Sequence, residues 1–430
     1  MLYAIHVHPH DIRDEGAERV VENITELGKI KTIIAEAMTL EERHPYPDGV
    51  LPHNPRHSVV VSWATLEVPL SGRLFSGLSI QPVPSAEVLA GNDYIGLLRK
   101  AAAVGGATVI PWVKGLNGAF SGRIEDLSVK TLDGQPVPTW LCPSRPETFE
   151  YIASLIEGIL DRYPSEAILL DRMRYPDWSG ANVQPERMLT CFCDSCCRMM
   201  EDEGIDLALL KSVLKRFLKQ PDQPGGRFQN LSGAELNEIR KWLGFRAALI
   251  TRLVDRVSTQ VKIYNQTRHM NTKFWLNLWP PSFAWFLGQD YQALGRLCDG
   301  AKHFPYHRLG GGADLKGLVE ALAIHEDREA QEKIFLMVME LLQIPYAMSF
   351  EKFKEFGFPV DFVGRETGIA KQAFGHCKQI FSGIQIWNTP MEEIDKACDS
   401  ARRGDADGFF FYCYGWAELK ALQTIGRIIG

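Results

Sequence analysis

Several features of common protein classes are missing from this sequence of 430 residues. No window approaches the roughly 18 uncharged apolar residues that a membrane-spanning helix needs, so we expect no membrane association. The start, MLYAIHVHPH, lacks the basic and apolar regions of a signal peptide. A formal net charge of −6, without a Lys/Arg run, gives no reason to expect nucleic acid as a partner. Together these absences favour a cytoplasmic protein.

Cysteine is present, but in a pattern that does not suggest disulfides. The nine cysteines are an odd number in a long chain, and reduced thiols or a metal site fit them better than a disulfide framework. The segment CFCDSCC (191–197) places Cys191, Cys193 and Cys196 in CxCxxC spacing. Three thiolates this close can surround one tetrahedral zinc ion, with Cys142 as the candidate fourth ligand. Free thiols in a buried loop are the alternative, and no organic cofactor is expected.

Short apolar runs alternate with helical patterns along the chain, which predicts parallel β/α units. Eight such units favour an α/β fold, a single (β/α)8 TIM barrel over residues 1–430. A doubly wound open sheet is the alternative, but no GxGxxG follows the first run. The eight apolar runs cover residues 2–8, 30–36, 107–114, 167–173, 273–279, 300–306, 380–387 and 408–414.

Three connections are too long for a minimal barrel. They span residues 39–91, 176–237 and 308–375. Long loops that follow barrel strands lie on the catalytic face and commonly shape the substrate site. We therefore predict one barrel domain with long insertions on that face.

The alternation of side chains along a strand predicts which residues face the barrel interior. In AILLDRMRYPDW, Asp171 and Tyr175 share the inward face, near the carboxyl end of the strand. Arg172 and Arg174 fall where the strand becomes a loop. The same parity at the other strand ends selects His6, His8, Glu36, Trp112, Lys114, Asn277, Trp279, Phe304, Tyr306, Gln385, Trp387, Tyr412 and Tyr414.

This predicted ring is rich in aromatic and hydrogen-bonding side chains. Sugars present apolar C–H faces and rims of hydroxyl groups, which aromatic platforms, amides, arginines and carboxylates bind well. We therefore expect a carbohydrate ligand, with His307 also helping to shape the site. The alternative is that the Trp and Tyr side chains simply fill the top of a wide barrel. A homo-oligomer is left open.

Two segments resemble a known enzyme family. The order CPSRP, helix, apolar strand with a carboxylate, then CFCDSC is similar to the catalytic barrel of family 42 glycoside hydrolases. With DRMRYP at the strand end, the segment also resembles the broader, uncharacterised glycosyl-hydrolase-like barrels of bacteria, and GQDYQAL and KHFPYHR strengthen that match. The similarity covers residues 141–200 and 285–308. It implies glycoside hydrolysis, and a structural zinc away from the chemistry on Cys142, Cys191, Cys193 and Cys196.

Glycoside hydrolysis normally uses two carboxyl groups. The resemblance places Asp171 on the fourth strand, where family 42 enzymes carry the glutamate acid/base and α-amylase-like barrels carry an aspartate nucleophile. The arginines beside Asp171 favour the ionised form, and hence a nucleophile or electrostatic stabiliser. A structural Asp–Arg pair is the alternative. On the seventh strand, where the family has a glutamate nucleophile, this chain has Gln385.

Two candidates remain for the second carboxylate. Asp290, in the loop after the fifth strand, ranks first, although it could instead cap a helix. Glu36, at the end of the second strand, ranks next, although it could pair with Lys114 or His8 as a binding group.

Two other classes of function stay open. The HVHPHD stretch puts His6 and His8 at the end of the first strand, where metal-dependent amidohydrolase-type barrels begin their metal site. This chain lacks the other ligands of that site, and binding of sugar hydroxyls by the two histidines is favoured. A barrel that binds a glycan without catalysis is the third reading, because Gln385 replaces an expected carboxylate.

Overall fold

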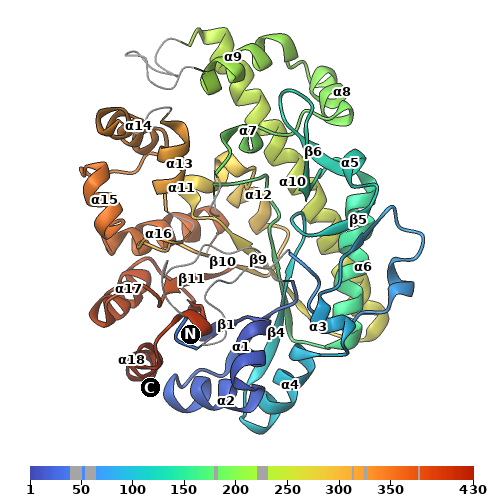
Figure 1. Cartoon of the computed structure of the whole chain (residues 1–430), viewed down its shortest axis with the longest axis vertical. Coiled ribbons are helices and arrows are strands. Elements are labelled where there is room, and N and C mark those ends of the chain that lie inside the picture. Colours follow the sequence, from blue (N-terminus) through green and yellow to red (C-terminus); the bar gives the residue numbers. More distant parts are fainter. Residues whose placement is uncertain are drawn as a thin grey trace.

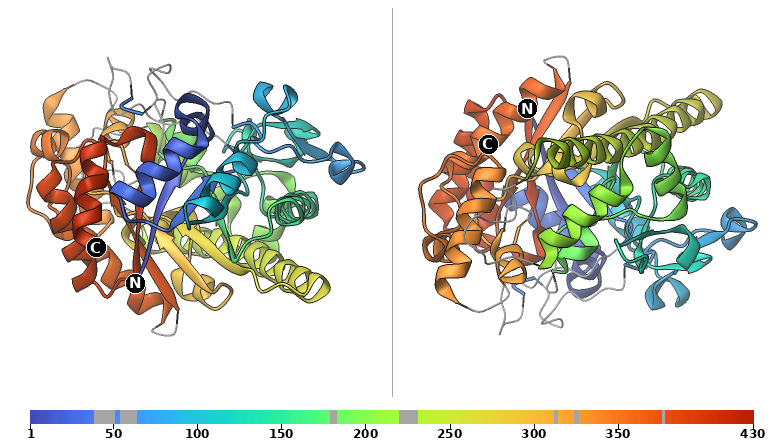
Figure 2. Two further views of the ribbon diagram at one scale, coloured as in Figure 1. Left: turned by 90° about the horizontal axis from the view of Figure 1, so that it is seen from below. Right: turned by 90° about the horizontal axis from the view of Figure 1, so that it is seen from above.

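The computed structural model describes residues 1–38, 51–53, 64–178, 183–219, 231–311, 314–323, 327–375 and 378–430. Eight parallel strands close into a barrel in the order β1–β12–β11–β10–β9–β8–β4–β2, and helices surround it (Figure 1, Figure 2). The predicted (β/α)8 barrel is confirmed. Its strands are β1 (Leu2–Val7), β2 (Thr32–Glu36), β4 (Thr108–Lys114), β8 (Ala167–Asp171), β9 (Lys273–Leu278), β10 (Gly300–His303), β11 (Gln379–Gln385) and β12 (Gly408–Tyr412).

Each barrel strand lies inside one of the predicted apolar runs or starts one residue before it. The runs are continuous because both faces of a parallel barrel strand are buried, one by the interior and one by the helices. Several strands end before the apolar pattern does. In particular, β8 ends at Asp171 and β12 at Tyr412, and the residues that follow them no longer obey the alternation.

The helices form between the strands where the sequence has helical periodicity. The longest, α10 (Gly233–Arg268), begins with a capping box between Ser232 and Glu235 and ends at His269 in the left-handed conformation. Within the described ranges, no helix is both long and apolar enough to cross a bilayer. The other helices are α1 (Pro9–Glu15), α2 (Ala17–Glu22), η1 (Asn23–Leu27), η2 (Gly72–Phe75), α3 (Ala86–Leu89), α4 (Tyr94–Val104), α5 (Ile124–Leu127), α6 (Pro146–Arg162), α7 (Pro185–Met188), α8 (Asp194–Asp202), α9 (Leu207–Lys219), α11 (Pro281–Ala284), η3 (Trp285–Leu287), α12 (Tyr291–Gly295), α13 (Lys316–Leu322), α14 (Arg328–Leu341), α15 (Phe350–Phe356), α16 (Asp361–Phe374), α17 (Met391–Arg403), η4 (Tyr414–Trp416) and α18 (Leu419–Ile429).

Long connections follow β2, β8 and β10, and a further one, between β4 and α6, was not predicted. The connection after β8 carries α8 and α9 to the end of the molecule opposite α2 and α18 (Figure 1). Two short antiparallel ribbons lie outside the barrel, and they pair β3 with β5 and β6 with β7. Their strands are β3 (Ile80–Pro82), β5 (Phe120–Gly122), β6 (Ser128–Lys130) and β7 (Pro136–Leu141).

The barrel interior contains a layer of large aromatic rings. Phe381 stacks on Phe410 with ring centroids 4.7 Å apart, and Trp275 meets Phe381 edge-on at 5.0 Å. These rings fill the interior as a packed core, as is usual for this fold. The inward residues closer to the carboxyl ends of the strands are polar or charged, and they form the mouth of the barrel.

Candidate active site

Asp171 ends β8 inside the barrel, and its side chain is almost fully buried. Its Oδ2 accepts a hydrogen bond from the indole N–H of Trp112 (3.0 Å), and its Oδ1 accepts one from the backbone N–H of Arg172 (2.6 Å). The Nη1 atom of Arg174 lies 3.4 Å from Oδ1. Burial raises the pKa of this carboxyl group, but the charges of Arg174, Arg172 and Lys114 lower the pKa below its ordinary value. Asp171 is therefore ionised at neutral pH.

The two arginines of DRMRYP are held by a carboxylate that was not predicted, Asp177. Its Oδ2 lies 2.7 Å from Nη2 of Arg174 and 3.2 Å from Nη1 of Arg172. The buried guanidinium of Arg174 also lies over the rings of Trp140 and Trp279. Arg172 has a φ of 59°, the left-handed conformation, which turns the chain out of the strand. The signal for Asp177 was its spacing of three residues from an arginine in the same short loop.

Glu36, at the end of β2, is the second buried carboxylate of the mouth. Its two oxygens contact Nζ of Lys114 and Nδ1 of His8, the two partners that the sequence suggested. Lys114 also donates to the carbonyl of Met38 (2.8 Å), and the strand register sets it beside Asp171. Burial raises the pKa of Glu36, but Lys114 and His8 lower this pKa below its ordinary value. Glu36 is therefore ionised as well.

Some buried polar atoms in the mouth have no hydrogen-bond partner among the described residues. Both ring nitrogens of fully buried His6 belong to this group, and its ring packs against Trp112 and Tyr412 with centroid distances of 4.7 and 5.2 Å. Burial and then the charge of Lys302 hold the pKa of His6 well below its ordinary value, so the ring is neutral. Buried polar atoms are rarely left unsatisfied, so these atoms are candidates for ligand binding. Further atoms of this kind are Oδ1 of Asn277 and Nε1 of Trp279 and Trp387.

Lys302, on β10, is a charged residue of the mouth that was not predicted. Its Nζ donates to Oη of Tyr306 (2.8 Å) and lies 5.1 and 5.5 Å from the ring centroids of Tyr306 and Tyr412. Tyr412 in turn contacts the ring of Trp387 at 5.3 Å. The aromatic side chains expected at this side of the mouth therefore lie together. The signal for Lys302 was available, because it shares the parity of Tyr306.

Two predicted site residues, Tyr175 and Tyr414, point away from the mouth. The ring of Tyr175 lies under the guanidinium of Arg246 on α10, 4.2 Å from it. The hydroxyl of Tyr414 donates to Glu15 (2.6 Å) and accepts from Asn23 (2.8 Å), so it faces the α1–η1 region outside the barrel. Both positions come after their strand has ended, where alternation no longer fixes the direction of a side chain.

Asp290, which ranked first as the second catalytic carboxylate, does not lie in the mouth either. Asp290 is exposed, and its carboxylate accepts a hydrogen bond from the backbone N–H of Ala293 (3.0 Å). This hydrogen bond caps α12. This is the capping alternative that the sequence left open. The structure thus brings Asp171 and Glu36 into the mouth and leaves Asp290 at the surface.

His307 and Gln385 hold the loop after β10. The Nε2 of His307 lies 3.1 Å from the carboxylate of Glu393 on α17. The side chain of Gln385 accepts the backbone N–H of Arg308 (3.2 Å) and donates to the carbonyl of Leu309 (3.2 Å). The amide of Gln385 thus has a structural use at the position where the resemblance to family 42 led us to expect a carboxylate.

The four predicted zinc ligands lie together, apart from this mouth. The sulfur atoms of Cys142, Cys191, Cys193 and Cys196 are all within 4.8 Å of one another, and all four residues are buried. Hydrogen bonds from Cys142, and then from the other two thiols, lower the pKa of Cys193. Four thiols at this spacing can hold a metal ion. Within the described ranges, no other group of three or more His, Cys, Asp or Glu side chains is arranged for one.

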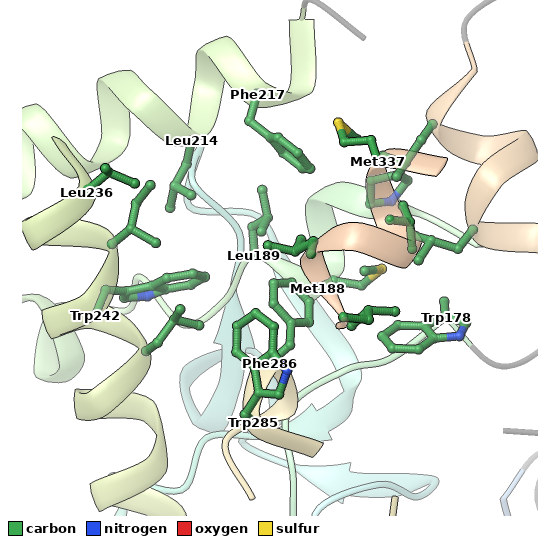
Figure 3. A pocket seen from close by; sticks show the side chains of 18 residues that line it. Trp178, Met188, Leu189, Leu214, Phe217, Leu236, Trp242, Trp285, Phe286 and Met337 are labelled. Atoms are coloured by element: carbon green, nitrogen blue, oxygen red, sulfur yellow. The ribbon is translucent and has the colours of Figure 1, made fainter. Parts of the chain in front are cut away.

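A separate cavity of about 170 Å³ lies between α9 and α10 on one side and α13 and α14 on the other (Figure 3). Its lining is apolar, and includes Trp178, Met188, Leu189, Phe217, Trp242 and Met337. Trp178 also contacts Trp279 of the mouth, with ring centroids 4.6 Å apart. The cavity has no ionisable side chain in its lining, so the chemistry must be sought in the mouth of the barrel.

No protein-family profile and no curated protein matches this sequence, but its structure is similar to solved glycoside hydrolases. The glycoside hydrolase domain of PgaB (BpsB) from Bordetella bronchiseptica superposes with a TM-score of 0.55 and 12% identity, over 97% of this chain and 95% of that one. The catalytic domain of β-amylase from Paenibacillus polymyxa gives 0.55 and 9%, over 100% and 97%. The chain has the barrel fold of glycoside hydrolases.

A longer enzyme shows the same likeness. The β-galactosidase from Marinomonas ef1 gives a TM-score of 0.55 at 10% identity, and the match covers 100% of this chain but 59% of that enzyme. At such low identities the similarity establishes the barrel alone, because one barrel fold carries many chemistries. Function has to be inferred from the side chains of the mouth.

Proposed function

We propose that this chain is a glycoside hydrolase in which Asp171 is the ionised carboxylate at the reacting carbon. The observation that carries the proposal is the position of Asp171, which is buried at the carboxyl end of a barrel strand and kept ionised by Arg174. Enzymes with this fold hold their catalytic groups at that end of the barrel. A carboxylate there can attack the anomeric carbon or stabilise the oxocarbenium-like transition state.

The surroundings of Asp171 support a sugar as substrate. The rings of Trp112, Trp279, Tyr306 and Trp387 supply flat apolar surfaces of the kind that bind the C–H faces of sugars. The unpartnered ring nitrogens of His6 and the indole N–H groups of Trp279 and Trp387 supply hydrogen bonds for hydroxyl groups. A polyhydroxylated ligand would satisfy both kinds of group at once.

Glu36 is the second carboxylate that we include in the site. It shares the mouth with Asp171, and Lys114 lies between the two, in contact with Glu36 and next to Asp171 in the register. Asp290 is not included, because its exposed carboxylate caps α12. Gln385 has no carboxyl group and cannot act as a nucleophile.

The test is a panel of aryl glycosides and oligosaccharides with wild type, Asp171→Asn and, as control, Asp126→Asn. Asp126 is an exposed aspartate paired with Arg123, so its substitution makes the same chemical change at the protein surface. We expect Asp171→Asn to lower kcat by about 10²–10⁴-fold, with the control at wild-type level. Turnover by folded Asp171→Asn at the wild-type rate would contradict the role of this residue.

A carbohydrate-binding barrel without catalysis is the second candidate function. The observation that favours it is the structural use of Gln385 at the position where a catalytic carboxylate is expected. The same panel separates the two functions, since a binding protein shifts its tryptophan fluorescence with a glycan but releases no product. The metal-dependent alternative is not proposed, because Nδ1 of His8 contacts Glu36, whose other oxygen is held by Lys114.

We also propose that the four-cysteine cluster holds a structural zinc ion. The donor set fits, since four buried thiols lie at the mutual distances that tetrahedral Zn–S bonds of about 2.3 Å require. Cys142 follows β7, whereas the other three lie at and before the start of α8. The ion would therefore tie these two parts of the chain together, without a role in the chemistry of the mouth.

A further inference from the structure

The two carboxylates of the mouth leave one requirement of glycoside hydrolysis unmet. The leaving oxygen of a sugar needs a proton, which a carboxylic acid with a raised pKa usually supplies. In this mouth, the pKa of both Asp171 and Glu36 is lowered, because each faces cationic side chains. Neither group carries a proton at neutral pH, so the proton has to come from elsewhere.

Among the described residues of the mouth, His6 and His8 are the other side chains that exchange protons near neutral pH. Within the part of the chain that the structure describes, His6 contacts no carboxylate, and burial together with the charge of Lys302 keeps it neutral. His8 differs, because its Nδ1 contacts Glu36 directly. A carboxylate on one ring nitrogen stabilises the imidazolium, and proton exchange with a ligand takes place at the other nitrogen, Nε2.

Contacts on several sides fix the orientation of the His8 ring. It stacks on His10 at 5.1 Å and is parallel to Trp416 at 6.3 Å, with interplanar angles of 19° and 6°. On a third side it meets the ring of Trp112 at 5.8 Å. The indole N–H of Trp112 donates to Asp171, so His8 and Asp171 contact the same tryptophan.

We propose that His8 is the proton donor and acceptor of the hydrolysis, and that Glu36 is its positioning residue. This inference rests on the proposed function. It changes the part of Glu36 from a second catalytic carboxylate to the group that fixes the ring and stabilises its charge. The catalytic pair is then a histidine on β1 and an aspartate on β8.

The reaction balances over two steps. In the first, Nε2 of the His8 imidazolium gives its proton to the glycosidic oxygen while the bond from that oxygen to C1 breaks, and an Asp171 oxygen bonds to C1. In the second, neutral His8 takes a proton from water, the water oxygen bonds to C1, and the ester bond to Asp171 breaks. Aspartate and imidazolium are regenerated, and Nδ1 keeps its proton toward Glu36 throughout.

Charged and titratable groups from five elements surround the His8 ring and set the pH dependence. Glu36 on β2 favours the imidazolium, whereas Lys114 on β4 opposes it. Tyr412 on β12 contributes a ring contact at 5.8 Å. From β1 and α1, the groups nearby are His6, His10 and Asp11, and Asp11 accepts the backbone N–H of His8 (2.9 Å).

The test compares two leaving groups in the same variants. A 2,4-dinitrophenyl glycoside needs no proton to depart, whereas an oligosaccharide does. We expect His8→Gln to lower kcat/KM by about 10²–10⁴-fold on the oligosaccharide, and by less than about tenfold on the dinitrophenyl glycoside. Azide should accelerate turnover of the latter by His8→Gln. The ratio of the two rates is independent of the folded fraction, so partial misfolding does not affect it.

Glu36→Gln is the second variant, and His269→Asn is the control, since His269 is an exposed helix C-cap in the left-handed conformation that asparagine tolerates. We expect Glu36→Gln to move the basic limb of the pH profile to lower pH, because the imidazolium loses its carboxylate. Equal losses of His8→Gln on both leaving groups, or no loss, would overturn the role of His8 and leave the proposed function intact. A wild type that cleaves no glycoside would overturn both.

Discussion

Arg174 is the residue on which the charge of Asp171 depends most. It is fully enclosed, with Asp171 and Asp177 as its ionic partners. We expect Arg174→Gln to lower the free energy of unfolding by roughly 3–5 kcal/mol, the usual effect of leaving buried charges unpaired. Urea unfolding measures this loss. The matched control is Arg123→Gln, which breaks an exposed pair with Asp126 and should change stability by less than about 1 kcal/mol.

We also expect Arg174→Gln to change the pH dependence of kcat/KM. With Arg174 in place, the pKa of Asp171 is lowered, and the carboxylate stays ionised into the acid range. Without Arg174, burial still raises the pKa of Asp171, so the acid limb of the kcat/KM profile should move to higher pH. A profile of Arg174→Gln that overlays the wild-type profile would show that the guanidinium does not control the charge of Asp171.

Side-chain parity fixes the direction of a side chain only while its strand continues, although His8 and Trp279 still lie in the mouth just past the ends of their strands. The alternation correctly turned Asp171, Trp112 and Lys114 to the interior, and the register then brought them into contact. It failed for Tyr175 and Tyr414, because both follow the end of a strand. The contact of His8 with Glu36 joins two neighbouring strands, and its length and geometry depend on the barrel tilt, which no single stretch of sequence encodes.

At the scale of elements, the cysteine cluster links the loop after β7 to the start of α8. We expect one zinc ion per chain by elemental analysis of purified protein. With free zinc at a thousand times Kd, binding to the folded state adds about 4 kcal/mol of stability. A chelator should therefore lower Tm. Cys193→Ser should lower it in the same way.

Cys197→Ser is the matched control for the cluster. Cys197 is a half-buried thiol next to Cys196, and its Sγ donates to the carbonyl of Phe192 (3.4 Å), which serine can also do. This variant should keep the zinc ion and the wild-type Tm. Wild-type protein without stoichiometric zinc would contradict the metal and leave four buried free thiols.

The elements that the sequence predicted well are those with a long periodic signal. Each of the eight barrel strands lies in a predicted apolar run or starts one residue before it. The ribbon strands β3, β5 and β6 have three residues each, too few for a period to be recognised. The elaborate connection after β4 was therefore not predicted, although it carries Cys142 and Trp140.

At the scale of the whole molecule, the count of β/α units was enough to predict a closed barrel. The similarity to glycoside hydrolases that share about a tenth of its residues shows how weakly this fold constrains sequence. What the fold does require is that both faces of each barrel strand are buried, and here some of the buried side chains are ionisable. His303 is one of them, because it is fully buried on β10 and its Nε2 lies 3.2 Å from the hydroxyl of Thr367.

Burial, and then the charge of Lys302, lower the pKa of His303 to about 3, and this predicts how global stability depends on pH. Below the ordinary histidine pKa of about 6.5, the unfolded chain binds a proton that the folded chain excludes. Stability should therefore fall with pH from 6.5 to 4.5, by up to about 1.4 kcal/mol per pH unit for this histidine. The raised pKa of buried Glu366 changes stability with pH in the opposite direction. Because wild type and His303→Gln both contain Glu366, its effect cancels when the two proteins are compared. Urea unfolding at pH 7, 6 and 5 should give a shallower slope for His303→Gln than for wild type, whereas parallel slopes would mean that His303 is protonated in the folded barrel.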